Sequence, residues 1–376
     1  MLEEHASRVL ALVSDDFGEL ANAMYLLDGT GASVRLLLSP RLQEHNPELS
    51  PHTVARYHSA ADVIEEMRQF RPQRLLLMSA YLFGVNGLLN LQDVEQILRE
   101  ARTLGVVSAT TDPFLGMLSA LSESTFASTQ GAAAMMHFGA LHEALRELPH
   151  LYLSPMPRSP SVHTFYNPRV IISKVQKAMA FASLWQGLLK LAAPHWLFVI
   201  SSADYKLQCA LHGRLQFDAM LLEKTQQCLL ANRRPILLAP PQACESLRGC
   251  SHESVILMAF CNYNMFRTLL LTAEHAFYWN ALSNSVLGRI VNGGSVFFMD
   301  VGHLARYIPP IVPLAMQSYY ANAQLPMLDP SQTLDAGELA QLARVQPETF
   351  AVARAALQAL PLPAELLASL SAAQMK

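Results

Sequence analysis

The sequence predicts an α/β protein with two Rossmann-like parallel-sheet domains and a helical C-terminal tail. Its 376 residues exceed the roughly 250–300 at which a single hydrophobic core stops growing. The chain is 51% hydrophobic and only 15% charged, so it has ample apolar material to bury. Short apolar runs also alternate with segments of helical period, in two separate series. Such alternation predicts β–α–β crossovers, and therefore parallel sheets with helices on both faces.

The first series occupies about the first 125 residues and defines an N-terminal domain that we place at residues 1–150. Its apolar runs are continuous rather than alternating, which indicates strands that are buried on both faces. The expected strands are Arg8–Ser14, Ser33–Ser39, Arg74–Ser79 and Val106–Thr110, and the expected helices are Glu19–Leu27, Ala60–Phe70, Leu91–Leu104 and Ala132–Glu147.

The pattern changes after residue 150. Residues 153–160 contain three prolines and cannot form regular structure, so we assign residues 151–194 to a Pro-rich bridge and a linker helix. A second α/β series at residues 195–330 forms the C-terminal domain, and the Ala- and Leu-rich residues 331–376 form the tail. The expected strands of this domain are Trp196–Ser201, Pro235–Ala239, Ser254–Ala259, His275–Tyr278 and Ser295–Met299, and its expected helices are Phe217–Ala231, Asn264–Thr272 and Asn284–Val291.

Charge and composition exclude several classes of protein. The 27 basic and 30 acidic residues give a net charge of -3, which argues against a nucleic-acid-binding protein. The most apolar runs are far shorter than the ~20 residues of a transmembrane helix. Residues 1–5 are acidic where a signal peptide would be basic, so we expect a cytoplasmic protein. None of the five cysteines forms a CxxC or zinc-like spacing, which favours reduced thiols and no metal site.

Carboxylates follow two strands of the first domain, at the edge of a parallel sheet where ligands bind. Asp15 and Asp16 come after the first strand in a segment with one glycine and no GxGxxG pattern, so we expect no dinucleotide cofactor. Either aspartate could be a general base, although aspartate in this place commonly caps the next helix. Asp112, which precedes a proline, has the same two interpretations: a helix cap or a carboxylate in the same cleft.

Hydroxyls and cations follow the first strand of the second domain. Ser201 and Ser202 would offer hydroxyls and free amides to a phosphate, and Lys206 and Arg214 would offer positive charge. A single lysine in a loop is more often simply solvated, so this pattern is weak by itself.

The most informative segment runs from residue 277 to residue 300. A buried strand ends at Trp279, and the polar residues Ser283, Asn284 and Ser285 then open a short helix. Hydroxyl and amide side chains add to the free N–H groups and positive dipole of a helix N-terminus, which predicts a diphosphate site. The alternative is that these residues only cap the helix. Asp300 and His303 follow the last strand, where they could meet a sugar hydroxyl or serve only in capping and packing.

The order of elements in this segment resembles the C-terminal domain of GT-B glycosyltransferases. The resemblance is carried by the helix Phe266–Leu270, the segment Ala273–Ala276, the polar loop and the turn at residues 292–294. It implies a donor-side second domain, whose loop from Asn280 to Ser285 binds a nucleoside-diphosphate sugar, and an acceptor-side first domain.

We therefore expect a glycosyltransferase that needs neither metal nor cofactor beyond its nucleotide-sugar donor. Two alternatives stay open on the same fold: a non-catalytic ligand-sensing or partner-binding protein, and a nucleotide-sugar epimerase. The helical tail offers a surface through which a homodimer could form.

Overall fold

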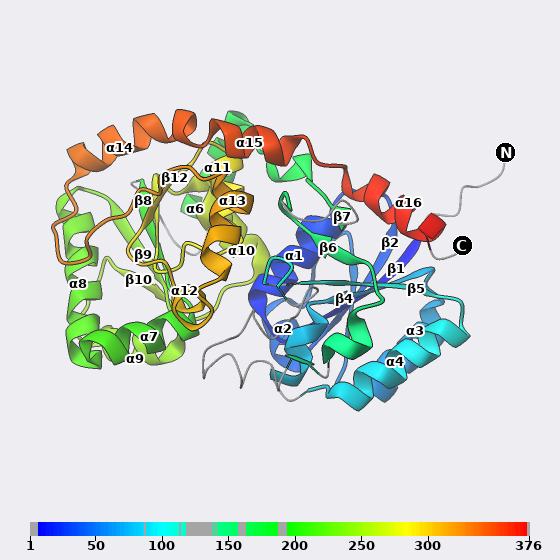
Figure 1. The fold of residues 1–376 in the computed structure, drawn as a ribbon. Helices are drawn as coiled ribbons and strands as arrows, with labels where there is room; N and C mark the ends of the chain where they lie inside the picture. The colour runs from blue at the N-terminus through cyan, green and yellow to red at the C-terminus, as the bar shows by residue number, and fades with distance from the viewer. Residues whose placement is uncertain are drawn as a thin grey trace. The chain divides into compact units, whose positions relative to one another are not determined.

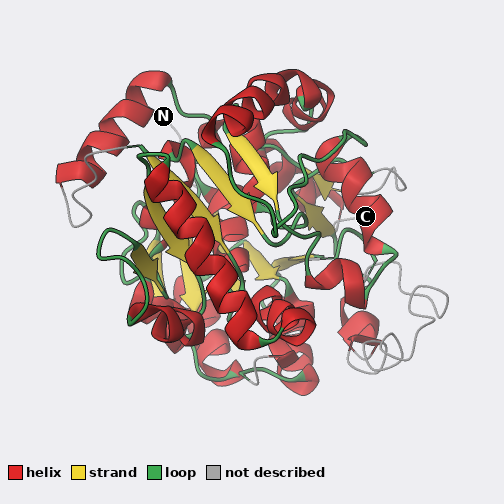
Figure 2. Ribbon diagram, turned by 90° about the vertical axis from the view of Figure 1, so that its left-hand side faces the viewer, coloured by secondary structure: helices red, strands yellow, loops and turns green. Residues whose placement is uncertain are grey.

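The computed structural model describes residues 7–85, 88–112, 114–117, 138–139, 141–156, 163–186 and 194–373. The chain divides into two compact units. The first consists of Met1–Arg169, Pro313–Tyr319 and Ala355–Lys376, and the second of Val170–Val312 and Tyr320–Arg354. Each contains a parallel sheet with helices packed against its faces (Figures 1 and 2).

The first unit is built on a seven-stranded sheet in the order β3-β2-β1-β4-β5-β6-β7, in which every neighbouring pair is parallel. Val9–Val13 in the central strand are fully buried, as a strand covered on both faces must be. The strands are β1 (Arg8–Val13), β2 (Ser33–Leu38), β3 (Thr53–Arg56), β4 (Arg74–Met78), β5 (Val107–Thr111), β6 (His150–Tyr152) and β7 (His163–Thr164). The helices are α1 (Phe17–Leu27), α2 (Pro40–His45), η1 (Ala80–Val85), α3 (Ala60–Phe70), α4 (Leu91–Thr103) and α16 (Pro363–Ala373).

The second unit is built on a five-stranded parallel sheet in the order β10-β9-β8-β11-β12. Its strands are β8 (His195–Val199), β9 (Arg234–Leu238), β10 (Ile256–Met258), β11 (His275–Tyr278) and β12 (Ser295–Phe298). Its helices are α6 (Lys174–Gln186), α7 (Ser202–His212), α8 (Arg214–Leu230), α9 (Pro241–Arg248), α10 (Tyr263–Thr272), α11 (Ser285–Val291), α12 (His303–Tyr307) and α14 (Ala336–Thr349). The 3-10 turn η3 (Pro168–Val170) and the helices α13 (Ile311–Tyr320) and α15 (Ala351–Gln358) contain residues of both units.

Aromatic rings form the centre of the second sheet. Phe277 on β11 stacks between Phe198 on β8 and Phe297 on β12, with ring centroids 4.8 Å and 5.5 Å away. These rings belong to one buried cluster with apolar side chains of α8, α9 and α14, including Phe217 and Leu339. The cluster covers one face of the sheet, because its strand residues are alternate ones.

Each sheet has one point at which the order of strands reverses. β1 lies between β2 and β4, and β8 lies between β9 and β11. In each sheet the chain first adds two strands on one side of the first strand and then adds the remaining strands on its other side. The loops that follow such strands separate and leave a crevice at the carboxyl edge, which is where doubly wound sheets bind ligands. The polar residues after β1 and β4, and after β8 and β11, therefore define the places to search for a site.

The expected strands agree with the structure to within about two residues at each end, and the structure adds β3, β6 and β7. β6 and β7 extend the first unit to Arg169, beyond the boundary at residue 150 expected from the sequence. They have only three and two residues, which is too short for any hydrophobic period to show. Of the expected helix Ala132–Glu147, residues 138–139 and 141–145 are helical, and residues 132–137 and 140 fall outside the described residues.

The tail at residues 331–376 is divided between the units rather than standing apart. α14 belongs to the second unit and α16 to the first, because each buries an apolar face there through residues such as Leu339 and Leu370. Among the helices described, none is both long enough and apolar enough to cross a membrane.

We expect Leu237→Ala on β9 to lower the free energy of unfolding by roughly 2–5 kcal/mol, because it leaves a cavity in the aromatic cluster. The matched control is Leu230→Ala at the end of α8, where the side chain is 87% exposed and the change should stay within about 0.5 kcal/mol. Urea denaturation of both variants measures the difference. Equal effects would show that the cluster does not stabilise this unit.

Candidate functional site

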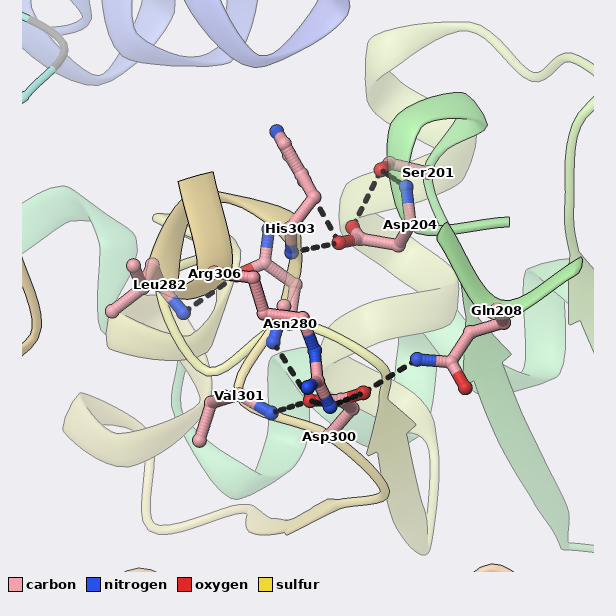
Figure 3. Close-up of polar contacts among 10 residues, drawn as sticks. Ser201, Asp204, Gln208, Asn280, Leu282, Asp300, Val301, His303 and Arg306 are labelled. Atoms are coloured by element: carbon pink, nitrogen blue, oxygen red, sulfur yellow. Dashed lines mark hydrogen bonds and ion pairs between the residues drawn. The ribbon is translucent and has the colours of Figure 1, made fainter. Parts of the chain in front are cut away.

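Polar side chains from three neighbouring strands meet at the carboxyl edge of the second sheet (Figure 3). Ser201 follows β8, Asn280 follows β11, and Asp300 and His303 follow β12. The structure thus brings together these four residues, which the sequence had singled out separately. Asp204 on α7 joins Ser201 to His303, and Gln208 joins α7 to Asp300; sequence reasoning did not identify these two residues of α7.

Asp204 holds His303 in one orientation. The carboxylate is 1% exposed, and its Oδ1 accepts hydrogen bonds from the backbone N–H and from Nδ1 of His303, both at 2.8 Å. Its Oδ2 accepts a hydrogen bond of 2.5 Å from the hydroxyl of Ser201, the residue that caps α7. Because Nδ1 faces the carboxylate, Nε2 lies on the far side of the ring from Asp204 (Figure 3). The His303 side chain remains 21% exposed, so this nitrogen is suited to meet a ligand.

Asp300 shapes the turn that precedes His303. Its oxygens accept from the backbone of Val301 at 2.6 Å, from Gln208 Nε2 at 2.5 Å and from Arg306 at 3.0 Å. The next residue, Gly302, has φ +98°, and a Cβ there would overlap the side chain of Asn280. Asp300 therefore stabilises a turn that lies close against the loop after β11, and only glycine fits at position 302 of that turn.

The donor loop predicted from the sequence lies at the start of α11. Asn284 occupies the N-cap position without a side-chain capping bond. The hydroxyls of Ser283 and Ser285 are 2.9 Å apart and bond to each other, and Ser285 also donates to the hydroxyl of Tyr278 at 3.4 Å. The side chains thus do not provide the cap that was the alternative interpretation, and the loop remains a candidate for binding oxygen-rich ligands.

The remaining residues predicted for the second domain occupy different positions. Ser202 and Lys206 are exposed on the first turns of α7, close in sequence to Asp204. Arg214 instead lies beside α9, where it donates to the carbonyl of Gln242 at 3.3 Å and pairs with Asp218 at 3.8 Å. Since Asp218 also accepts from side chains on α7 and α9, Arg214 belongs to a network that joins these helices.

The two carboxylates predicted as bases after β1 are both occupied. Asp16 caps α1 and accepts from the N–H groups of Gly18 at 2.7 Å and Glu19 at 3.3 Å. Asp15 accepts from Arg41 Nε at 3.0 Å and from the hydroxyl of Ser39. The capping interpretation therefore describes Asp16, whereas Asp15 connects the β1 loop to α2.

Asp112, predicted after β5, is buried and accepts a hydrogen bond within the following turn, from the N–H of Phe114 at 2.8 Å. Its negative charge acts on a neighbouring buried carboxyl, that of Glu19 on the first turn of α1. Three side chains lie close together near the reversal point of the first sheet. They are Glu19 at the start of α1, Ser79 after β4 and Asp112 after β5.

Glu19 is a candidate functional residue that sequence reasoning missed. Its Oε1 accepts from Asn22 at 3.2 Å, and its Oε2 has no hydrogen-bond partner within the described residues. The pKa of Glu19 is raised to about 7, chiefly by burial and also by the charges of Asp16 and Asp112, while hydrogen bonds from Ser79 and Asn22 partly offset the rise. A carboxyl that titrates near neutral pH is typical of a general acid or base.

The sequence contained a misleading signal at this position. Asp16 and Glu19 have the spacing of a capping box, in which the glutamate side chain reaches back to the N-cap N–H. In the structure the N–H of Asp16 bonds to the carbonyl of Ser14 instead, and Glu19 turns inward. Ser79 beside it has φ +54°, an uncommon conformation for a residue other than glycine and one that collects at functional sites.

We expect Glu19→Gln to stabilise the protein increasingly as the pH rises from 5 to 8. The unfolded carboxyl ionises near pH 4.5 and the folded one near pH 7, so the folded protein loses stability across this window. The full loss is on the order of 3 kcal/mol, and glutamine removes it. Urea denaturation at several pH values measures the difference between variant and parent.

The control for this measurement is Glu95→Gln on the exposed face of α4, whose effect should not change with pH. A difference between Glu19→Gln and the parent that stays constant from pH 5 to 8 would contradict the raised pKa.

Comparison with known proteins identifies the fold. No protein-family model matches the sequence, and comparison with curated proteins gives no significant match. Among solved structures, the chain is similar to CalG4, the calicheamicin glycosyltransferase, with a TM-score of 0.52 and 9% identity over 98% of each chain. It is also similar to Phytolacca americana UGT2 complexed with UDP-2-fluoro-glucose and pterostilbene, with a TM-score of 0.50 and 12% identity over 99% of this chain and 100% of the other. The protein has the GT-B fold, which confirms the resemblance inferred from the sequence.

Among the described residues, no group of three or more His, Cys, Asp and Glu side chains is arranged to hold a metal ion. Independence from metal stays a prediction.

Proposed function

We propose that this protein is a metal-independent glycosyltransferase that uses a nucleoside-diphosphate sugar as donor. The observation that supports it most directly is the pair formed by Asp204 and His303 at the reversal point of the second sheet. On a GT-B fold, an imidazole held there by a buried carboxylate is suited to recognise an anionic ligand.

The donor diphosphate would be recognised by groups of three kinds. Asp204 holds Nδ1 of His303, so that Nε2 on the far side of the ring would bind a phosphate oxygen. The N-terminus of α7 adds free N–H groups and the positive end of its dipole. Hydroxyls of Ser202, Ser283 and Ser285 supply neutral donors around them. Together these groups stabilise the charge that develops on the departing diphosphate, without a metal.

Glu19 would act as the general base in the first domain. Its ionised carboxylate takes the proton from the acceptor hydroxyl while that oxygen forms a bond to the anomeric carbon. The bond from that carbon to the phosphate oxygen breaks, and the nucleoside diphosphate leaves with the electron pair. A pKa of about 7 matches this task, since the group is then both basic enough to accept the proton and ionised near neutral pH.

This assignment replaces Asp15 and Asp16 as the first choice of base, because both are occupied by structural partners. Asp112 is proposed to support Glu19 by keeping its pKa high. Because the carboxylates of Asp15 and Asp16 are both held by structural partners, an alternative is also favoured. This alternative is a non-catalytic protein that binds a nucleotide sugar on this fold.

Nucleotide binding can be measured first, by thermal unfolding with UDP, GDP, ADP and dTDP. We expect at least one of them to raise the melting temperature at millimolar concentration. His303→Ala should weaken that nucleotide at least tenfold, because a charge-assisted hydrogen bond contributes about 1.5–3 kcal/mol.

The matched control is His252→Ala, which removes an exposed histidine from the loop before β10, at the amino edge of the same sheet. This variant should bind as the parent does. The absence of any shift with all four nucleotides would contradict a donor site.

Catalysis is tested with sugars linked to the nucleoside diphosphate that binds, by measuring the release of that nucleoside diphosphate. We expect Glu19→Gln to lower kcat by about 10²–10⁴-fold and to leave nucleotide affinity unchanged. In the parent, kcat/KM should fall as the pH drops below about 7, where Glu19 becomes protonated; the variant should lack this limb. Glu95→Gln again serves as the control.

The reaction products separate the remaining possibilities. A transferase forms a glycoside, or free sugar when water is the acceptor, whereas an epimerase converts the donor into an isomeric nucleotide sugar of the same mass. A protein that binds nucleotide and forms neither product is non-catalytic.

A further inference from the structure

A pocket lies at the opposite, amino edge of the second sheet, lined by residues of α6, α10 and α11. Of these helices, α10 packs against both α6 and α11; Figure 1 labels all three. Its volume is about 500 Å³, within the range of small-molecule sites. All of its lining residues belong to the second unit. Phe181, Leu271 and Ala343 form apolar walls, and Lys177, His275 and Arg289 contribute polar groups.

Arg289 on α11 is a buried cation that lacks a carboxylate partner among the described residues. Its Nη atoms donate to the carbonyls of Leu270 and Ala273 at the end of α10, and to that of Ser295, at 2.8–2.9 Å. Its Nε has no partner within the described chain. Carbonyl dipoles offset only part of the cost of burying a full charge, and burial lowers the pKa of Arg289 to about 10.

Lys177 brings a second positive charge to the same pocket. Its Nζ donates to the carbonyl of Asn292 at 3.0 Å, and both burial and the charge of Arg289 lower its pKa. Glu274 is the one acidic residue in the lining. Its oxygens are taken by Arg233 and by Nε1 of Trp196, at 3.0 Å for the latter. The two cations thus repel each other, with the one neighbouring carboxylate already neutralised.

Gly294 makes room for this arrangement. A Cβ at this position would lie 2.5–2.8 Å from the guanidinium of Arg289, so any other residue would displace it. Ser295 donates its hydroxyl proton to the carbonyl of Glu274, so Nδ1 of His275 donates to the Ser295 oxygen at 2.7 Å. The other ring nitrogen of His275, a residue that lines the pocket, is Nε2, which is then an acceptor.

We propose that this pocket is a second ligand site, distinct from the carboxyl-edge site, and that it binds a small organic anion through Lys177 and Arg289. The anionic group, a phosphate or a carboxylate, relieves the repulsion between the two cations. A hydroxyl or amino group on the ligand donates to Nε2 of His275, and its carbon skeleton packs against Phe181 and Leu271. Hydroxy acids, amino acids and phosphorylated polyols all carry this combination of groups.

The test uses thermal unfolding of the full chain with three probes: inorganic phosphate, glycerol 3-phosphate and lactate, with sodium chloride at matched ionic strength as reference. We expect saturable stabilisation by at least one probe beyond that of chloride. Stabilisation by phosphate compounds alone assigns a phosphate ligand, and stabilisation by lactate alone assigns a carboxylate. Stabilisation by none of them beyond chloride overturns the proposal.

Substitution of one cation locates the site. Lys177→Gln should weaken the active probe at least tenfold, whereas Lys174→Gln, an exposed lysine one turn earlier on α6, should bind as the parent does. The stabilisation should persist in His303→Ala, which separates this pocket from the donor site. Equal affinity in Lys177→Gln and the parent overturns the assignment.

An internal carboxylate provides an independent readout. Ala178 lines the pocket, so in Ala178→Glu the new side chain should take the place of the ligand. We expect a higher melting temperature without ligand and the loss of probe binding. Ala182→Glu, one turn further along α6 and outside the lining, is the matched control and should do neither. A lower melting temperature for Ala178→Glu with probe binding intact overturns the proposal.

Discussion

The burial of β1 and β8 on both faces is the constraint on which the rest of the structure depends. A central parallel strand has no polar face, so the chain can place polar side chains only where such a strand ends. The reversal of strand order beside β1 and β8 then opens a crevice at each carboxyl edge. Glu19 with Asp112, and Asp204 with His303, collect at these two edges for the same topological reason.

Buried charge has a different outcome at each of three positions. Asp204 is paired with an imidazole and a hydroxyl, so its burial orients His303. Glu19 has too few donors, so burial shifts its ionisation toward neutral pH. Arg289 keeps its charge among carbonyl groups, and that leaves a positive pocket at the amino edge. The degree of compensation by neighbours, rather than burial alone, decides whether a group orients, titrates or attracts an anion.

Local sequence signals were reliable where neighbours in the chain decide the structure. The cap at Asp16, the polar opening of α11 and the long apolar strands follow from short-range rules, and the structure contains all of them. The same rules do not identify Glu19, because tertiary packing turns its side chain inward. Arg214 is similar: its charge suggested phosphate binding, but Asp218 engages it beside α9.

The sequence by itself determined the α/β class and the two series of parallel strands, since both depend on hydrophobic period. It also carried the resemblance to the GT-B fold, through the order of elements and the residues of the segment around Phe266–Leu270. Only the tertiary structure decided which polar groups act together. Asp204 and His303 are 99 positions apart, and Lys177 and Asn292 are 115 apart. Contacts of that separation depend on strand order and helix packing, which no local pattern encodes. Burial, which sets the pKa of Glu19 and isolates Arg289, likewise exists only once the sheets and helices have packed.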